Sequence, residues 1–151
     1  MRLKEAASTL ADLSAGAFRP VLGDASVESG DVTRLVLCSG KVYYDLAQAR
    51  EARQIRDVAI LRLEQLYPWN EELANALAPY KDGTKLYWVQ EEPRNYGPWY
   101  YINANLPNAL HHRFPLSCVS RAPSASSRLR SGGRHRAGAG FGPVIPVGRG
   151  L

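Results

Sequence analysis

The sequence predicts an α/β fold with a mostly parallel β-sheet and helices on both of its faces. Four short apolar runs, rich in β-branched and aromatic residues, have the composition of buried strands. The stretches between them carry helical periodicity over roughly 10–15 residues, and this alternation is typical of βαβ units. With 151 residues and 45% hydrophobic content, the chain is large enough for one core.

The beginning of the chain has the weakest pattern. The segment "RLKEAASTLADL" is weakly helical, and the segment "SAGAFRPVLGDASVESGDV" that follows is rich in turn-forming residues. We therefore expect residues 1–31 to form a leading helix and loop, and residues 32–121 to form the α/β domain.

The first strand–helix–strand unit comes next. The run "TRLVLC" is apolar and predicts a buried strand. Val42, Leu46 and Ala49 recur at spacings of four and three, so residues 42–56 are predicted to form a helix. The run "DVAILRL" predicts the second strand.

The second helix has a clear start signal. Asn70 is a candidate N-cap, and Glu71 and Glu72 stand in the first turn, where carboxylates suit the helix dipole. The helix "EELANALAPY" is expected to stop at Pro79, and the run "TKLYWVQ" predicts the third strand.

The last helix follows a polar segment. Residues 91–97 are expected to form a connecting loop at the carboxyl end of the third strand, where α/β folds place functional groups. Pro98 is acceptable at the first position of a helix over residues 98–112, and Pro107 is expected to kink or end it. The run "FPLSCVSR" predicts the fourth strand.

The net charge of +5 comes from the end of the chain. Residues 1–120 hold 13 basic and 14 acidic side chains, whereas the remainder holds six arginines and no acid. A basic face on the domain is therefore not supported, and we expect no nucleic-acid partner. Nucleic-acid binding through the arginine tail is the weakest alternative, and it would be steeply salt-dependent.

The chain shows neither a membrane-spanning pattern nor a cysteine framework. It has no run of about 18 apolar residues, and its N-terminus lacks an apolar stretch of signal-peptide length, so we expect no membrane partner and no export. Cys38 and Cys118 each lie in an apolar run, and we expect both to be buried free thiols. Their surroundings give no zinc-site spacing.

Three kinds of residue could carry function. Ser39, Gly40 and Lys41 stand between a strand and a helix, where they could hold an anion; the pattern lacks the rest of a nucleotide-hydrolysing P-loop, and a tight turn is the simpler interpretation. Three glutamates could serve acid–base chemistry, namely Glu64, Glu91 and Glu92. We favour the simpler interpretation that they form ion pairs with Arg62 or Arg94.

The aromatic residues could form a subunit interface or stack on a ligand. We slightly favour the interface, since tyrosine and tryptophan are common on surfaces that a partner half-buries. The residues concerned are Tyr43, Tyr44, Tyr96, Trp99, Tyr100 and Tyr101.

Four blocks occur in order along the chain: "LVLCSGKVYYDLAQARE", "VAILRLEQLYPW", "YWVQEEPRNYGPWYYI" and "VSRAPSAS". Together they closely resemble the C-terminal region of the thiamine-dependent 2-oxoglutarate dehydrogenase component, the decarboxylating subunit of the 2-oxoglutarate dehydrogenase complex. The resemblance covers about residues 1–126. It implies a three-layer α/β/α sandwich like the C-terminal domain of transketolases.

The resemblance also implies partners and cofactors. Members of this family are homodimers that hold thiamine diphosphate and Mg²⁺ in upstream domains, decarboxylate 2-oxoglutarate and transfer a succinyl group to a lipoyl acyltransferase. The family's Gly-Asp-Gly cofactor motif and its upstream histidines have no counterpart in this sequence. The resemblance therefore implies a C-terminal fragment with a structural and dimerisation role, without catalytic residues or cofactor of its own. It implies the cytoplasm in a bacterium, or the mitochondrial matrix in a eukaryote.

Two sets of residues can be carried over from the family. In some relatives this region binds a regulatory acyl-CoA or nucleotide, which points to Ser39, Lys41, Arg53, Arg56 and Arg121. The family motif also supplies interface candidates, which are Glu91, Glu92, Arg94, Asn95 and Trp99.

The chain departs from the family after Ser126. Relatives continue with proline, a small-residue turn and an acid-bearing terminal helix, whereas this chain continues with arginine, glycine, alanine and proline. We therefore expect residues 122–151 to be disordered or to be read out of frame in a GC-rich gene. Translating the other two frames tests the frameshift, and it is refuted if neither frame encodes an acidic amphipathic helix.

Overall fold

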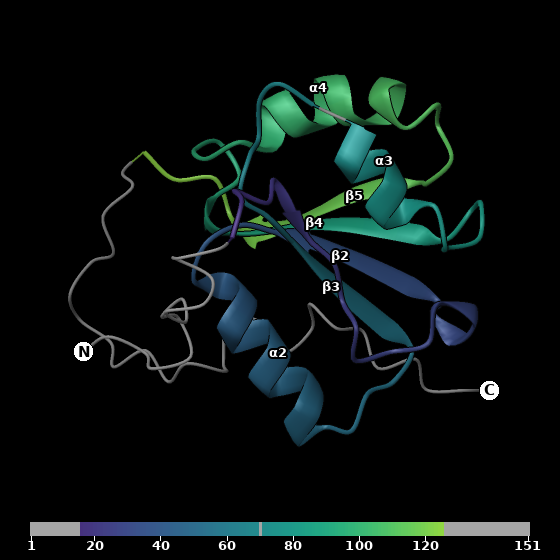
Figure 1. The fold of residues 1–151 in the computed structure, drawn as a ribbon. Coiled ribbons are helices and arrows are strands. Elements are labelled where there is room, and N and C mark those ends of the chain that lie inside the picture. Colours follow the sequence, from purple (N-terminus) through teal and green to yellow (C-terminus); the bar gives the residue numbers. More distant parts are fainter. Residues whose placement is uncertain (1–15, 70, 126–151) are drawn as a thin grey trace.

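A computed structural model describes residues 16–69 and 71–125. These residues form a five-stranded sheet with helices on both faces (Figure 1). The predicted α/β sandwich with a mostly parallel sheet is confirmed. The predicted leading helix, the cap at Asn70 and the predicted state of residues 126–151 lie outside the described residues. The domain boundaries at residues 31 and 121 stay predictions.

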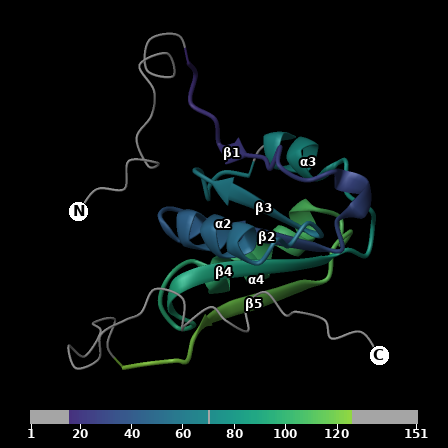
Figure 2. The ribbon, with the colours of Figure 1, turned by 90° about the horizontal axis from the view of Figure 1, so that it is seen from below.

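The sheet has the strand order β1-β3-β2-β4-β5, which Figure 2 shows from below. Its four longer strands run parallel to one another. They are β2 (Arg34–Cys38), β3 (Val58–Leu63), β4 (Lys85–Pro93) and β5 (Leu116–Arg121). The fifth strand, β1 (Val21–Leu22), is antiparallel to β3 at the edge of the sheet.

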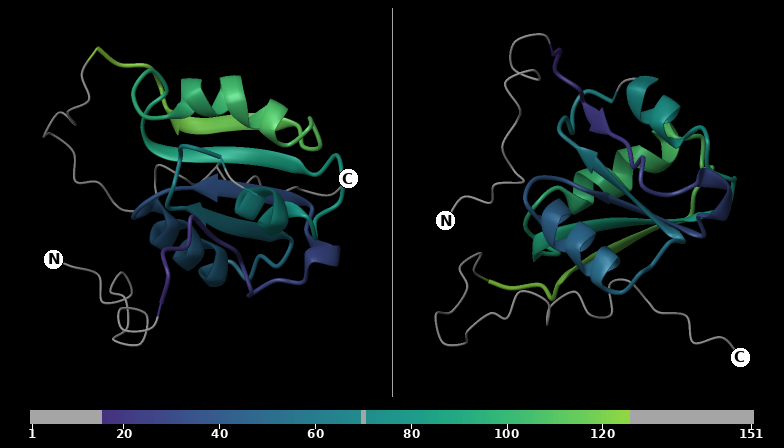
Figure 3. Two further views of the ribbon diagram at one scale, coloured as in Figure 1. Left: turned by 45° about the horizontal axis from the view of Figure 1, so that its top comes forward. Right: turned by 60° about the horizontal axis from the view of Figure 1, so that its bottom comes forward.

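Three α-helices and one short 3₁₀ helix complete the fold. They are η2 (Ser29–Asp31), α2 (Val42–Ala52), α3 (Glu71–Leu77) and α4 (Trp99–Ala109). The helix α2 covers one face of the sheet, and α3 and α4 cover the other (Figure 1). Two further views show α4 lying along β4 and β5 (Figure 3).

The two faces of the sheet divide the core into two clusters. In β2, Leu35 and Leu37 point toward α3 and α4, while Val36 and Cys38 point toward α2. Successive side chains of a strand alternate between faces, so a strand buried on both sides must be apolar at every position. The continuous apolar runs that predicted the strands have this origin.

The structure corrects the predicted ends of several elements. The segment expected to be only a loop contains β1, which is too short to leave a periodic signal. Glu91 and Glu92 lie in β4, not in a connecting loop, because the strand continues to Pro93 after a register shift. The helix α2 ends at Ala52, four residues before the predicted end, and Gln54 adopts a φ of 52° just after it.

Prolines delimit the last helix. Pro98 precedes α4 as its N-cap instead of occupying the first helical position. Pro107 lies inside the helix, which ends two residues later at Ala109, in agreement with the expectation that this proline kinks or ends it.

Candidate functional site

The candidate site lies where the strand order reverses. From β2 the chain moves outward to β3, returns past β2 to β4, and continues outward to β5. The segments that follow β2 and β4 therefore leave neighbouring strands for opposite faces, toward α2 and α4 (Figure 1). In open α/β sheets, the crevice at the carboxyl ends of two such strands is the usual place for a ligand.

A tight turn links β2 to α2 at this point. Gly40 has a φ of 65°, a left-handed conformation that a side chain would strain. The turn directs Lys41 toward β4, where its Nζ lies 3.0 Å from Glu91 Oε1. The hydrogen bond and the charge of Glu91 raise the pKa of Lys41. Both side chains are exposed, so this ion pair links the turn after β2 to the end of β4 at the surface of the molecule.

Arg121 reaches the same place from the end of β5. Its Nε donates a hydrogen bond of 2.8 Å to the backbone oxygen of Glu91. The structure thus brings together two cations of the predicted regulatory set, Lys41 and Arg121, with Ser39 next to them in the turn. Arg53 and Arg56 follow the opposite end of α2, roughly 16 Å along the helix axis at 1.5 Å per residue. They do not belong to this group.

Two of the three glutamates, Glu64 and Glu91, form ion pairs, and only one of these pairs involves an arginine named in the prediction. Glu64 lies 2.6 Å from Arg62, as expected. Glu91 pairs with Lys41 instead of Arg94, and Arg94 lies over the ring of Trp99 with its guanidinium carbon 5.3 Å from the centroid.

Two aromatic residues hold Arg62 at the edge of the site. The guanidinium carbon lies 5.0 Å from the ring centroid of Tyr43 and 5.3 Å from that of Tyr44. Arg62 also donates a hydrogen bond of 2.7 Å to the hydroxyl of Tyr44. The arginine is therefore fixed by cation–π contacts and by a hydrogen bond.

Gln90 organises the segment after β4, and sequence reasoning did not single it out. Its side chain is 3% exposed. Its Oε1 accepts a hydrogen bond of 2.9 Å from Trp88 Nε1, and its Nε2 donates to the backbone oxygens of Pro93 and Tyr96 at 3.1 and 2.9 Å. The one available signal was a polar residue at the end of the apolar run "LYWVQ".

The next residues hold the chain where it leaves β5. The side chain of Asn95 makes two hydrogen bonds with the backbone of Ser124, at 2.8 and 3.0 Å. The hydroxyl of Tyr96 donates to the backbone oxygen of Ala125 at 3.1 Å. Of the predicted interface set, Trp99 is buried, while Glu92 and Asn95 are exposed.

The free thiols differ in burial. Cys38 is fully buried, and this burial raises its pKa to about 12. Cys118 is only half-buried, so the prediction of two buried thiols holds for Cys38 alone.

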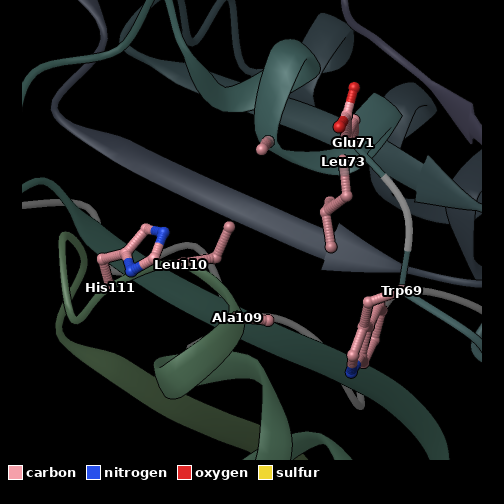
Figure 4. Close-up of a pocket in the computed structure, with 7 residues that line it drawn as sticks. Trp69, Glu71, Leu73, Ala109, Leu110 and His111 are labelled. Atoms are coloured by element: carbon pink, nitrogen blue, oxygen red, sulfur yellow. The ribbon is translucent and has the colours of Figure 1, made fainter.

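A separate hollow of about 370 Å³ lies between α3 and α4. Figure 4 shows Trp69 and His111 at its two ends. The other labelled residues that line it are Glu71, Leu73, Ala109 and Leu110.

Residues 16–69 and 71–125 offer no group of three or more metal-ligating His, Cys, Asp and Glu side chains. Within the same ranges, no helix has the length and apolar character needed to cross a membrane. The site presents two exposed cations, Lys41 and Arg121, which could bind an anion if Glu91 released Lys41.

Comparison with known proteins covers most of the chain. The family described as 2-oxoglutarate dehydrogenase C-terminal matches residues 7–138. This match continues past Ser126, and the frameshift stays a prediction. The 2-oxoglutarate dehydrogenase E1 component of Azotobacter vinelandii is 54% identical over 66% of this chain and 11% of its own length. That of Haemophilus influenzae is 45% identical over 80% of this chain and 13% of its own length.

A mammalian relative has a different substrate in its name. The 2-oxoadipate dehydrogenase complex component E1 of Mus musculus is 38% identical over 90% of this chain and 15% of its own length. The chain thus spans a small C-terminal-type portion of much longer proteins. The match over residues 7–138 shows that this chain belongs to the 2-oxoglutarate dehydrogenase C-terminal family.

Proposed function

We propose that this chain is the C-terminal domain of the E1 component of a 2-oxoglutarate dehydrogenase complex. The observation that carries the proposal is the family match over residues 7–138, together with E1 components at 45% and 54% identity. In this proposal the longer protein oxidatively decarboxylates 2-oxoglutarate and transfers a succinyl group to a lipoyl acyltransferase. It works as a homodimer in the bacterial cytoplasm.

The proposed role of the domain is structural. Thiamine diphosphate and Mg²⁺ are assigned to the upstream part of the longer protein, as the resemblance to the family implies. We assign no step of the reaction to this chain. Its proposed contribution is to support the dimer through the face that carries α4, where the side chain of Tyr100 is 62% exposed.

A chimeric enzyme tests this proposal. In the E1 component of Azotobacter vinelandii, the matching segment is replaced by residues 16–125 of this chain, and 2-oxoglutarate decarboxylation and molecular mass are measured. Retained activity and a dimeric mass are expected, because the two segments share the fold. A stable, folded chimera without activity would contradict the proposal. Turnover by the isolated chain with thiamine diphosphate and Mg²⁺ would contradict the structural role.

A second candidate function is regulatory binding of an anionic nucleotide or an acyl-CoA. The convergence of Lys41 and Arg121 on Glu91 at the switch point favours it. A ligand that binds only the folded chain stabilises it by about 2.7 kcal/mol at a hundredfold excess over Kd. Thermal unfolding is measured with a nucleoside phosphate and with an acyl-CoA. Lys41→Ala should abolish any stabilisation and Arg53→Ala should not, and an equal effect of both substitutions would refute this site.

A further inference from the structure

The two edges of the sheet differ in how their backbone groups are bonded. The strand order places β1 beside β3 at one edge and β5 at the other, as Figure 2 shows. An edge strand presents a row of unpaired N–H and C=O groups, to which another strand can add. The bonding of each edge therefore decides where a further chain could join the sheet.

The edge at β3 is closed by backbone and side chains together. The strand β1 pairs with the end of β3. Nearer the start of β3, the N–H of Ile60 donates a hydrogen bond of 2.8 Å to the carboxylate of Asp24. Arg50, which forms an ion pair with Asp24, donates one of 3.0 Å to the backbone oxygen of Val58. These two side chains take the place that a longer β1 would occupy.

The strand β5 is bonded on one side only. The backbone oxygen of Pro115 accepts a hydrogen bond of 2.9 Å from the N–H of Leu86 on β4. Successive residues of a strand direct their backbone groups to opposite sides, so Leu116, Cys118 and Ser120 direct theirs away from β4. Within the described part of the chain, no backbone hydrogen bond reaches these groups. We call them the open edge.

The open edge lacks the features that commonly prevent strand pairing. The strand β5 contains no proline and no lysine, and its one charged residue is Arg121 at its end. The Nε of Arg121 donates a hydrogen bond of 2.8 Å to the backbone oxygen of Glu91, which directs the guanidinium toward β4. None of the six residues of β5 is buried. A neutral, uninterrupted edge is therefore available to another strand.

We propose that the open edge pairs with the open edge of a second copy of this chain, so that two sheets join into one. In a pair related by a two-fold axis, the two β5 strands run antiparallel. The open edge is centred on Cys118, so Cys118 faces Cys118 of the second copy, and Leu116 of each copy faces Ser120 of the other. Each facing pair exchanges two N–H···O=C hydrogen bonds. This pairing goes beyond the proposed role in the E1 component and needs only this chain.

The unequal edges favour a second copy over any longer assembly. The joined sheet ends on both sides at the β3 edge, which β1, Asp24 and Arg50 close. The assembly therefore stops at two copies, which is the commonest closed symmetry. The charges permit it as well. In the antiparallel arrangement the two Arg121 side chains lie at opposite ends of the paired stretch, so like charges do not meet.

The first test is the molecular mass of the full chain in solution, measured by light scattering over a range of concentrations. A dimer is expected. Ser120→Pro removes one outward N–H from each copy and leaves the bonds to β4 in place, and an edge strand tolerates proline at such a position. It should raise the dimer dissociation constant at least about tenfold. Ser120→Ala is the matched control, because it keeps the N–H and should dimerise as the unaltered chain does.

The second test is a cross-link between the two copies of Cys118. Facing residues of a hydrogen-bonded pair have Cα atoms about 5.5 Å apart, so a short bifunctional thiol reagent should join them. Cys38 does not compete, because it is fully buried and this burial raises its pKa to about 12. Cys118→Ser should abolish the cross-link and keep the dimer.

A monomeric unaltered chain would overturn the proposal, and so would a dimer that Ser120→Pro leaves equally strong. A dimer that the reagent fails to join at Cys118 would place the contact elsewhere, such as the face that carries α4, and would reject pairing at β5. Growth beyond two copies would reject it too, since the β3 edge would then be open. If circular dichroism shows that Ser120→Pro is unfolded, the cross-link in the unaltered chain decides. No enzyme activity enters these tests, so they fail independently of the proposed function.

Discussion

The carboxylate of Asp24 is the most constrained charge in the described part of the chain. Its side chain is only 4% exposed and pairs with Arg50 of α2, which is 12% exposed. It accepts hydrogen bonds from the N–H groups of Ile60 and Ser26 at 2.8 and 3.0 Å. Asp24 therefore ties the segment before β2 to α2 and to β3. Asp24→Asn removes its charge with little change in shape.

The expected loss can be estimated from the surroundings of Arg50. Removing one partner of a buried ion pair costs about 3–5 kcal/mol, because the other charge stays buried. Arg50 would keep two acceptors, the oxygen of Val58 at 3.0 Å and Oγ of Ser26 at 2.5 Å. We therefore expect the lower end of the range, about 3 kcal/mol. With a urea m-value of about 1.5 kcal/mol/M, the midpoint should fall by about 2 M.

The stability lost in Asp24→Asn should depend on pH in a defined direction. Burial acts to raise the pKa of Asp24, but hydrogen bonds from Arg50, Ser26 and Ile60 outweigh it and hold the pKa below its usual value. A carboxyl with a lowered folded-state pKa stabilises the fold above its unfolded pKa of about 3.9. The difference between the two proteins should therefore be constant at neutral pH and should shrink as the pH falls below about 4.

Asp82→Asn provides the matched control. Asp82 pairs with Arg113 at 2.7 Å, but its side chain is 75% exposed, so its loss should cost at most about 1 kcal/mol. Urea unfolding followed by circular dichroism measures both variants. Equal losses in the two variants, or a loss below about 1 kcal/mol for Asp24→Asn, would refute the reasoning from burial.

Two further substitutions and one chemical treatment have defined outcomes. Gln90→Leu should lower the free energy of unfolding in urea by about 2 kcal/mol, because Trp88 Nε1 loses its acceptor. An unchanged urea midpoint would contradict the role of this amide. Gly97→Ala should lower the free energy of unfolding by about 1–2 kcal/mol, since the residue has a φ of 69° and a Cβ would lie 3.0 Å from Gln90 Nε2. A more stable variant would contradict this. A thiol reagent at pH 8 should modify Cys118 well before Cys38, whose burial raises its pKa to about 12. Mass spectrometry of the digested protein measures both sites, and equal rates of modification would disprove the expectation.

The regular part of the fold could be predicted from the sequence. Strands buried on both faces leave continuous apolar runs, and α2 leaves the spacing of Val42 and Leu46, both of which are buried. The strand β1 has two residues and leaves no period. The extension of β4 to Pro93 depends on pairing with Arg121 across a register shift, which is a contact between distant parts of the chain.

The candidate site was only partly predictable, because it too depends on contacts between distant parts of the chain. A turn at Gly40 follows from its place between a strand and a helix, but the pairing of Lys41 with Glu91 joins residues 50 positions apart. The structure places Arg53 away from Lys41, because a helix of 11 residues separates them. The buried amide of Gln90 was missed, because one polar residue in an apolar run shows neither its burial nor its partners.

The hydrogen bonds of Asn95 and Tyr96 have a mechanical consequence. They fasten Ser124 and Ala125 to the same short stretch that begins at Glu91. A force applied to the chain beyond Ala125 would be transmitted to that stretch before it reached the strands. The exposed ion pair between Lys41 and Glu91 would therefore be strained before the sheet itself is.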